Sequence, residues 1–254
     1  MRPRIFFLLA VLVFCPLVPQ SIAIEPSRED AGKQVIDDWQ AKRPKAFQCS
    51  YIHWHYDRNF GSKENDFLLR EATGTWQVFS PDRWDVRVEA AKEFNSAKNG
   101  LVAMADARDQ WMCDGQAFFQ FDFREQTLHE YVLPAPKQQS WIFSVTFGIL
   151  GERSRWITDP RFIRDHATIK VSTPASAQAE IWLEICPNEQ RDKTSFEKLD
   201  LILDSSDFRT KGVQFHSSEG RRRTVFVFTS LAHPPLVESL FPPATPTGWK
   251  RIVE

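Results

Sequence analysis

The chain lacks an excess of either charge. Its 254 residues include 32 Lys and Arg against 33 Asp and Glu, a net charge of −1. Proteins that bind nucleic acid usually present a basic face to the phosphates. We therefore expect no nucleic-acid partner. The sequence also has no internal repeat and no low-complexity linker, so we expect one domain rather than several.

Motifs of the common catalytic classes are also missing. There is no Gly-x-Ser-x-Gly elbow, no phosphate-binding loop and no His-Glu-x-x-His pair. We therefore expect neither a cofactor nor an enzyme. A metal-dependent or hydrolytic enzyme remains a third alternative, since two carboxylates about 5 to 9.5 Å apart suffice for glycoside hydrolysis and sequence does not give that distance.

Long apolar runs are absent except at the N-terminus. Two arginines precede the apolar residues 5–18, and Ser21-Ile-Ala23 is a small-x-small cleavage site. The run is too short to cross a bilayer comfortably. We expect a signal peptide over residues 1–23, cleaved after Ala23, and export of residues 24–254 as a single domain to the periplasm or the cell exterior.

Cysteine is scarce, with three residues beyond the expected signal peptide: Cys49, Cys113 and Cys186. An oxidising compartment permits a disulfide, but the odd number leaves at least one thiol over. All three lie in expected strands, where a free cysteine often behaves as a small buried apolar residue. A disulfide and its pairing are therefore both left open.

What the sequence does have is 21 Phe and 9 Trp, many of them in alternating runs. Trp76 and Val78, then Trp84, Val86 and Val88, recur at the period of two that is typical of strands. Asp114-Gly115 is a hairpin signal, because both residues tolerate positive φ. The pattern predicts an antiparallel meander.

The remaining elements follow from similar patterns. Ala31, Val35 and Trp39 are spaced as on one face of a helix, which Pro44 ends. Residues 91–99 are polar and predict a loop, and residues 141–150 predict one or two short helices. The further strands are expected at 47–60, 67–79, 84–90, 117–123, 127–133, 161–172, 180–186, 198–204, 212–216 and 224–229, with an extended tail at 241–249. This predicts a mainly β (α+β) chain, a curved antiparallel sheet or incomplete β-barrel with an N-terminal helix and a short mid-chain helical lid.

Several runs resemble the LolA-like periplasmic lipoprotein carriers. The matching runs are Gly74–Pro81 with the following Asp82-Arg83-Trp84, Asp114–Asp122, and Phe241–Gly248. The resemblance implies a half-barrel with a leading helix and a helical lid over an apolar cavity, and carriage of a hydrophobic group. The chain also resembles an uncharacterised secreted domain family of planctomycetes, through Cys49–Trp54, Pro81–Trp84, Cys113–Gly115 and Gly248–Arg251.

An apolar cavity of this kind would bind a lipid or the acyl chain of a lipoprotein. The alternative is a structural or protein-interaction module whose barrel is filled by its own side chains. The residues expected to line the cavity and lid are Phe119, Phe121, Phe123, Trp141, Phe143, Phe147 and Ile149, with Phe226 and Phe228 or, on the other face of that strand, Val225 and Val227.

Two further patterns are alternatives to simple packing. Cys49, His53 and His55 share one face of a strand, and thiolate with imidazole suits zinc or copper. We expect no metal, and take a buried cysteine beside stacked histidines as the ordinary interpretation. The basic run Arg221-Arg-Arg223 suits an anionic lipid surface or a membrane-associated partner, with an exposed turn as the ordinary interpretation.

Overall fold

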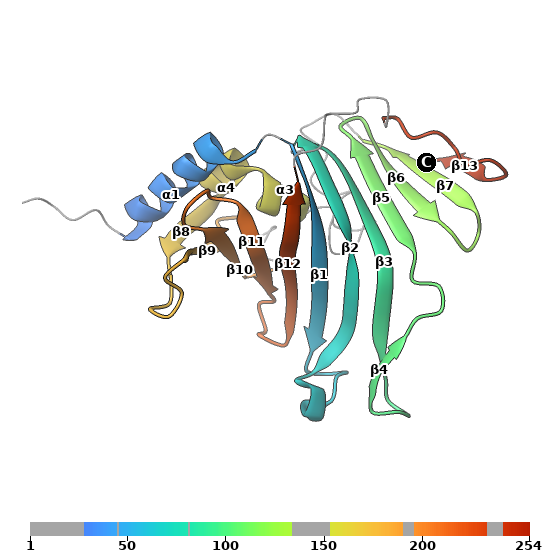
Figure 1. Cartoon of the computed structure of the whole chain (residues 1–254), viewed down its shortest axis with the longest axis horizontal. Helices are drawn as coiled ribbons and strands as arrows, with labels where there is room; N and C mark the ends of the chain where they lie inside the picture. Colours follow the sequence, from blue (N-terminus) through green and yellow to red (C-terminus); the bar gives the residue numbers. More distant parts are fainter. Residues whose placement is uncertain (1–27, 45, 81, 134–152, 190–195, 233–240) are drawn as a thin grey trace, which may run out of the picture.

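The computed structural model describes residues 28–44, 46–80, 82–133, 153–189, 196–232 and 241–254. These residues form one 13-stranded sheet (Figure 1). The helices are α1 (Arg28–Lys42), α3 (Arg153–Thr158), α4 (Pro160–His166) and the short 3-10 helix η1 (Lys63–Asn65). The strands are β1 (Phe47–Asp57), β2 (Leu68–Ser80), β3 (Arg83–Asn95), β4 (Gly100–Ala103), β5 (Asp109–Asp114), β6 (Ala117–Asp122), β7 (Thr127–Val132), β8 (Ala167–Val171), β9 (Glu180–Pro187), β10 (Lys198–Asp204), β11 (Thr210–His216), β12 (Arg222–Ala232) and β13 (Lys250–Val253).

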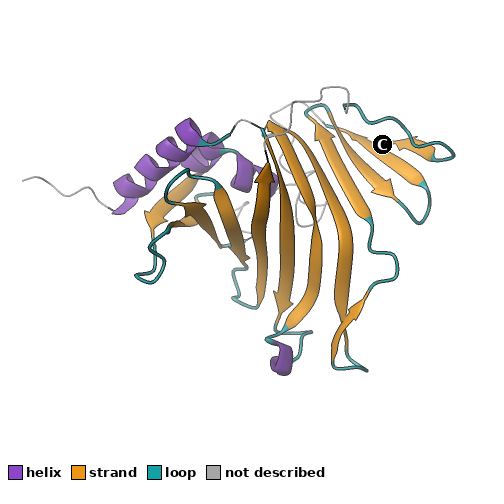
Figure 2. Cartoon of the chain, in the orientation of Figure 1, coloured by secondary structure: helices purple, strands orange, loops and turns teal. Residues whose placement is uncertain are grey.

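The sheet is open and strongly curved (Figure 2), with α1 and α4 at its β8 end. Its strand order is β13-β7-β6-β5-β3-β2-β1-β12-β11-β10-β9-β8, with β4 paired to β3. Every pairing is antiparallel except that of β13 with β7. Strands β1 and β12 join the two halves of the sheet across a long sequence separation. The predicted mainly β, curved antiparallel fold is confirmed.

Helix α1 was expected from the spacing of its apolar residues, and it packs on the sheet through a buried face. Ile36 and Trp39 are buried on that face, while Glu29 and Asp30 lie in the first turn, where the helix dipole favours negative charge. The helix packs against β8 and α4 at the end of the sheet. Lys42 is its last residue, as expected before Pro44.

Two large apolar clusters cover the two faces of the sheet. On β6 the neighbouring residues Phe118 and Phe119 belong to different clusters, because successive side chains of a strand point to opposite faces. The larger one, called here the main core, contains Trp39, Trp76, Trp84, Trp156, Phe118, Phe196, Phe215 and Phe226 among others. The smaller, called here the tail cluster, contains Met112, Ala117, Phe119, Phe121 and Leu128, with Phe123, Phe241 and Trp249 packed against it.

The expected strand at 161–172 begins later than predicted. Residues 160–166 form α4, because the Asp159 side chain accepts a hydrogen bond from Phe162 N at 3.1 Å and Pro160 lies in the first turn. The Trp156 and Phe162 rings then pack 4.9 Å apart, between centroids, which joins α3 to α4. The strand expectation holds for β8 alone.

The expected loop at 91–99 is also shorter than predicted. Strand β3 continues to Asn95 and pairs with β4, and Ala91 is buried with Ala72 and Val88. Cross-strand pairing here outweighs the polar composition of the segment. The hairpin at Asp114-Gly115 is confirmed, with φ of 87° at Gly115.

The chain ends with the edge strand β13, which pairs in parallel with β7, and Phe241 and Trp249 of the preceding tail pack on the tail cluster. The expected signal peptide and the expected lid at 141–150 lie outside the described residues. In the part of the chain that the structure describes, no helix has both the length and the apolarity needed to cross a membrane.

Candidate binding pocket

A pocket of about 190 Å³ lies where the C-terminal end of α1 and helix α3 meet β1, β2, β11 and β12. We call its buried apolar lining, which includes Trp39, Cys49, Trp76 and Ile157, the floor, and its more exposed lining, which includes Arg209 and Lys211, the mouth. The lining residues are Trp39, Arg43, Pro44, Phe47, Cys49, Trp76, Ile157, Arg209, Thr210, Lys211, Phe228 and Thr229. We call this set the α1 pocket.

The floor of the α1 pocket is built from aromatic rings on paired strands. The ring centroids of Trp76 and Phe228 are 5.5 Å apart, and those of Phe47 and Trp76 are 6.4 Å apart. Cys49 is paired in register with Trp76 across β1 and β2. Such a surface offers apolar contact and little hydrogen bonding, which suits an alkyl chain.

One polar atom at this floor has no partner. The indole Nε1 of Trp76 is buried and forms no hydrogen bond with any described group. Buried indole N–H groups usually find an acceptor. Within the described residues, Trp76 therefore contributes its ring area to the fold and no side-chain hydrogen bond.

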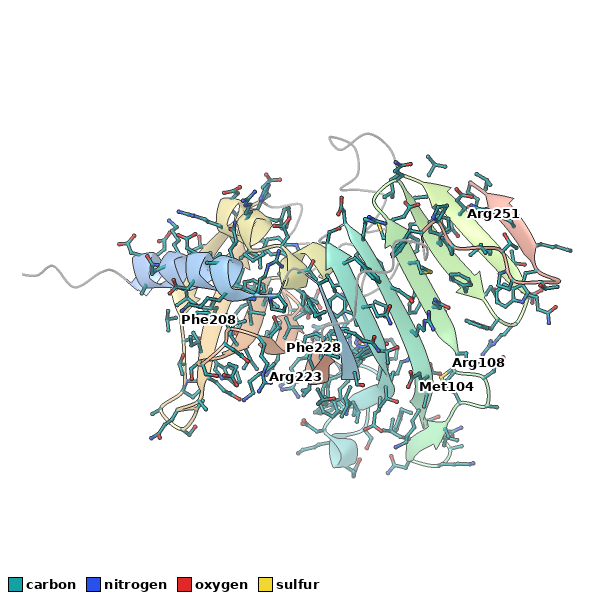
Figure 3. The ribbon with its side chains drawn as sticks, turned by 45° about the horizontal axis from the view of Figure 1, so that its top comes forward. Met104, Arg108, Phe208, Arg223, Phe228 and Arg251 are labelled. Carbon is teal, nitrogen blue, oxygen red and sulfur yellow. The ribbon has the colours of Figure 1, made fainter. Side chains whose placement is uncertain are left out.

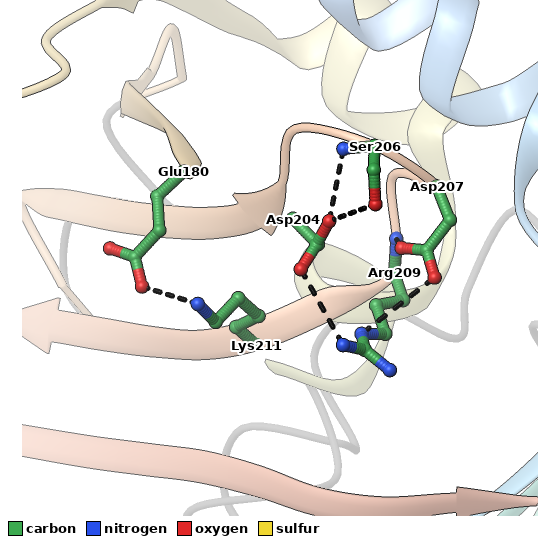
Figure 4. A network of polar contacts seen from close by, with 6 residues as sticks. All are labelled: Glu180, Asp204, Ser206, Asp207, Arg209 and Lys211. Carbon is green, nitrogen blue, oxygen red and sulfur yellow. Dashed lines mark hydrogen bonds and ion pairs between the residues drawn. The ribbon is translucent and has the colours of Figure 1, made fainter. Parts of the chain in front are cut away.

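Two cations at the mouth are held by carboxylates (Figure 4). Lys211 Nζ lies 2.6 Å from Glu180 Oε1. Arg209 Nη2 lies 3.5 Å from Asp204 Oδ2, and its Nε lies 3.8 Å from Asp207 Oδ2. These pairs join β9, β10 and β11 and compensate both positive charges.

Arg43 differs from the other two cations. Its guanidinium donates from Nη1 to the carbonyl oxygen of Thr158 and lies 5.8 Å from the centroid of the Trp39 ring. It forms no ion pair with any residue in the described ranges. Burial lowers the pKa of Arg43, because removal from water disfavours the cation, and the neighbouring Asp159 partly opposes this.

Of the residues predicted to line a cavity, Phe228 lies in the α1 pocket. Phe226 is buried on the same face of β12, outside the pocket lining, with its ring stacked on His53 at 4.5 Å between centroids. The inward face of β12 therefore carries Phe226 and Phe228, rather than Val225 and Val227. A role for these residues in ligand binding stays a prediction.

The predicted aromatic set on β6 lies elsewhere. Phe121 and Phe123 pack in the tail cluster against Trp249, at 6.1 and 5.2 Å between ring centroids, and Arg251 lies over the ring of Phe119 at 5.8 Å. Figure 3 shows Phe228 near the middle of the sheet and Arg251 at the β13 edge. The C-terminal segment covers this face of β6, so these rings are outside the α1 pocket. The other predicted residues, Trp141, Phe143, Phe147 and Ile149, lie outside the described residues.

The three residues of the alternative metal set, Cys49, His53 and His55, each have a different neighbour in the structure. Cys49 is in the α1 pocket, His53 is stacked on Phe226, and His55 Nδ1 lies 3.3 Å from Thr224 Oγ1. Burial raises the pKa of the Cys49 thiol to about 12, which disfavours the thiolate that a metal requires. Within the described residues, no group of three or more His, Cys, Asp or Glu side chains is arranged to hold a metal ion.

The cysteines beyond the expected signal peptide are free thiols in the structure. Cys49 and Cys113 are buried in the main core, and Cys186 is half-buried. No disulfide joins these three, all of which lie in the described part of the chain. Their burial matches the ordinary interpretation of a cysteine as a small apolar residue.

Sequence reasoning missed most of the α1 pocket. Trp39 was expected on the apolar stripe of α1, yet nothing in its spacing points to Thr210 and Lys211 on a strand far along the chain. Arg43 follows the last residue of the helix, where a basic side chain is ordinary. Two lining residues were singled out from the sequence, Phe228 from the alternation of β12 and Cys49 as a candidate metal ligand.

The carboxyl with the most raised pKa lies outside the α1 pocket. Burial raises the pKa of Asp109 to about 6, and Asp122 adds to the shift, while Arg70 and Arg124 oppose it. Raised carboxyl pKa values occur at catalytic sites and also in structural positions. Asp109 does not line the pocket, so it gives no support there to the hydrolytic alternative.

The raised pKa of Asp109 predicts a pH-dependent stability. Since the folded state favours the protonated acid, ionisation destabilises the fold as pH rises from about 4 through about 6. We expect Asp109→Asn to be more stable than the wild type at pH 7, and the difference to shrink toward pH 4. Urea unfolding at both pH values measures this. Glu125→Gln, on an exposed acid, is the control, and an Asp109→Asn difference independent of pH would contradict the prediction.

The comparisons with known proteins concern the fold. No family model and no curated protein matches the chain. An uncharacterised conserved protein of Thermus thermophilus matches with a TM-score of 0.49 and 7% identity, over 88% of this chain and 99% of that chain. The LolA superfamily protein NE2245 of Nitrosomonas europaea matches with a TM-score of 0.40 and 11% identity, over 83% and 96%.

A third structure is the Pseudomonas aeruginosa MucA/MucB complex, with a TM-score of 0.39 and 13% identity over 81% of this chain and 59% of that chain. At these identities and TM-scores the matches carry no argument about function, which rests on the geometry of the α1 pocket. The LolA superfamily, which the sequence motifs resemble, is among the folds to which this chain is similar.

Proposed function

We propose that the chain is an exported, non-enzymatic protein that binds a hydrophobic ligand, one alkyl or acyl chain of a lipid, in the α1 pocket. The observation that carries the proposal is a preformed pocket with the aromatic floor of Phe47, Trp76 and Phe228. Apolar lining with a few polar groups at one end is the usual form of a site for such ligands.

The volume limits what the pocket holds. About 190 Å³ is below the roughly 300–1,000 Å³ of typical small-molecule sites. One chain segment fits this space, and the several chains of a lipoprotein anchor do not fit within it together. We therefore propose a single-chain ligand for the α1 pocket.

Filling the pocket tests the proposal. Thr229 is exposed on β12 and lines the mouth, so Thr229→Trp places a ring there at little cost to the core. We expect the wild type to bind decan-1-ol and decanoate in isothermal titration calorimetry, and Thr229→Trp to weaken both at least tenfold, about 1.4 kcal/mol.

Thr73→Trp is the matched control, because Thr73 is also an exposed threonine on a strand and lies outside the pocket. It is expected to bind both probes as the wild type does. Equal binding by all three proteins would place the site elsewhere. Absence of binding by the wild type would contradict the proposal and leave the protein-interaction module as the function to test.

A further inference from the structure

The charged side chains that line the α1 pocket all carry the same sign. Arg43, Arg209 and Lys211 are cations, and no Asp or Glu is among the lining residues. The pocket therefore combines an apolar floor with a mouth that offers hydrogen-bond donors. A ligand that matches both parts carries acceptor oxygens at one end of an alkyl chain.

Of the three cations, Arg43 is the one without an ion pair among the described residues, and the nearby Asp159 acts on its charge only through space. Lys211 and Arg209 have carboxylate partners at 2.6 Å and at 3.5 and 3.8 Å. Arg43 has a neutral partner, the carbonyl of Thr158, and no ion pair among the described residues. A half-buried cation without a paired anion is costly to the fold, so an anion bound beside it is stabilised.

The shape of the Arg43 side chain decides which anion fits. A guanidinium is a planar fork with five N–H donors, and its edges match a carboxylate or a phosphate with two parallel hydrogen bonds. The Thr158 carbonyl engages Nη1, which fixes the group and leaves the other donors. The guanidinium lies over the Trp39 ring, which is itself part of the apolar floor.

We infer that the α1 pocket selects single-chain amphiphiles with an anionic head group, a carboxylate or a phosphate, and that Arg43 receives this head group. The inference rests on the proposed function, because it needs the alkyl chain to lie on the floor beside Trp76 and Phe228. It adds the polarity of the ligand and its orientation, with the head group at the C-terminal end of α1.

Calorimetric titration with three decyl probes, decanoate, decyl phosphate and decan-1-ol, tests the inference. We expect the wild type to bind at least one anionic probe about tenfold or more tightly than the alcohol. The anion that binds more tightly identifies the head group. In Arg43→Gln, which keeps a donor for Thr158, the ratio of anion to alcohol affinity is expected to fall toward one.

Two further variants test whether the effect of Arg43 depends on its charge, on the shape of its guanidinium and on its position in the pocket. Arg43→Lys keeps the charge without the fork, and an intermediate ratio is expected. Arg164→Gln removes an exposed arginine of α4 that pairs with Asp37, outside the pocket, and the wild-type ratio is expected to remain.

The outcomes distinguish the two proposals. Equal affinity of the wild type for all three probes would overturn the anionic head group and leave the proposed function standing. A ratio unchanged in Arg43→Gln would overturn the assignment to Arg43. Absence of binding of every probe would overturn the proposed function and this inference together.

Discussion

Replacing Gly74 by alanine is expected to destabilise the protein by about 3 kcal/mol or more. Gly74 follows a register irregularity between Thr73 and Gly74 in the β2–β3 pair. A Cβ at this position would overlap the backbone carbonyl oxygen of Arg87, and it would lie 2.9 Å from the Tyr51 hydroxyl oxygen. The same hydroxyl donates to that carbonyl at 3.2 Å, so the neighbours cannot move apart without loss of a bond.

Urea unfolding of Gly74→Ala against the wild type measures this cost. Gly100→Ala is the matched control, because the nearest atom to an added Cβ there is 3.8 Å away. It is expected to change the free energy of unfolding by at most about 0.5 kcal/mol. Similar free energies for the two variants would show that the sheet relaxes around Gly74.

Trp76→Ala is expected to lower the free energy of unfolding by about 3–5 kcal/mol. The side chain is 1% exposed, and its ring touches those of Phe47 and Phe228 across β1 and β12. Removing it enlarges the α1 pocket into the main core. Because strands far apart in sequence pack on this ring, local relaxation cannot fill the space.

Trp76→Phe distinguishes ring area from hydrogen bonding. The buried Nε1 has no partner among the described groups, so its loss removes no bond. We expect Trp76→Phe to cost about 1–2 kcal/mol, from the smaller apolar area alone. Chemical unfolding of both variants is the measurement. A cost for Trp76→Phe as large as that for Trp76→Ala would show that the N–H is bonded in the folded protein.

Much of the sheet could be predicted because its signals are local. The alternation of Trp84, Val86 and Val88 reports strand β3, and the Asp114-Gly115 pair reports a turn in which Gly115 takes φ of 87°. The stripe of α1 reports a helix for the same reason. Each pattern needs only neighbours in sequence.

The two wrong secondary-structure predictions, at residues 161–172 and 91–99, also have physical reasons. The strand expected from residue 161 overlooked Asp159-Pro160, which is a local helix-start signal and begins α4. The loop expected at 91–99 could not be corrected locally, because β3 continues there through its pairing with β4 and the burial of Ala91.

The sequence by itself determined which side chains share a face of a strand, because the period of two is a property of the backbone. It placed Phe119 and Phe121 together on β6, and Phe226 and Phe228 together on β12. Only the tertiary structure decided which face is covered and which borders a pocket. Trp249 packs on Phe121, while Phe228 lines the α1 pocket. These contacts join residues that are distant in the chain, and local patterns carry no information about them.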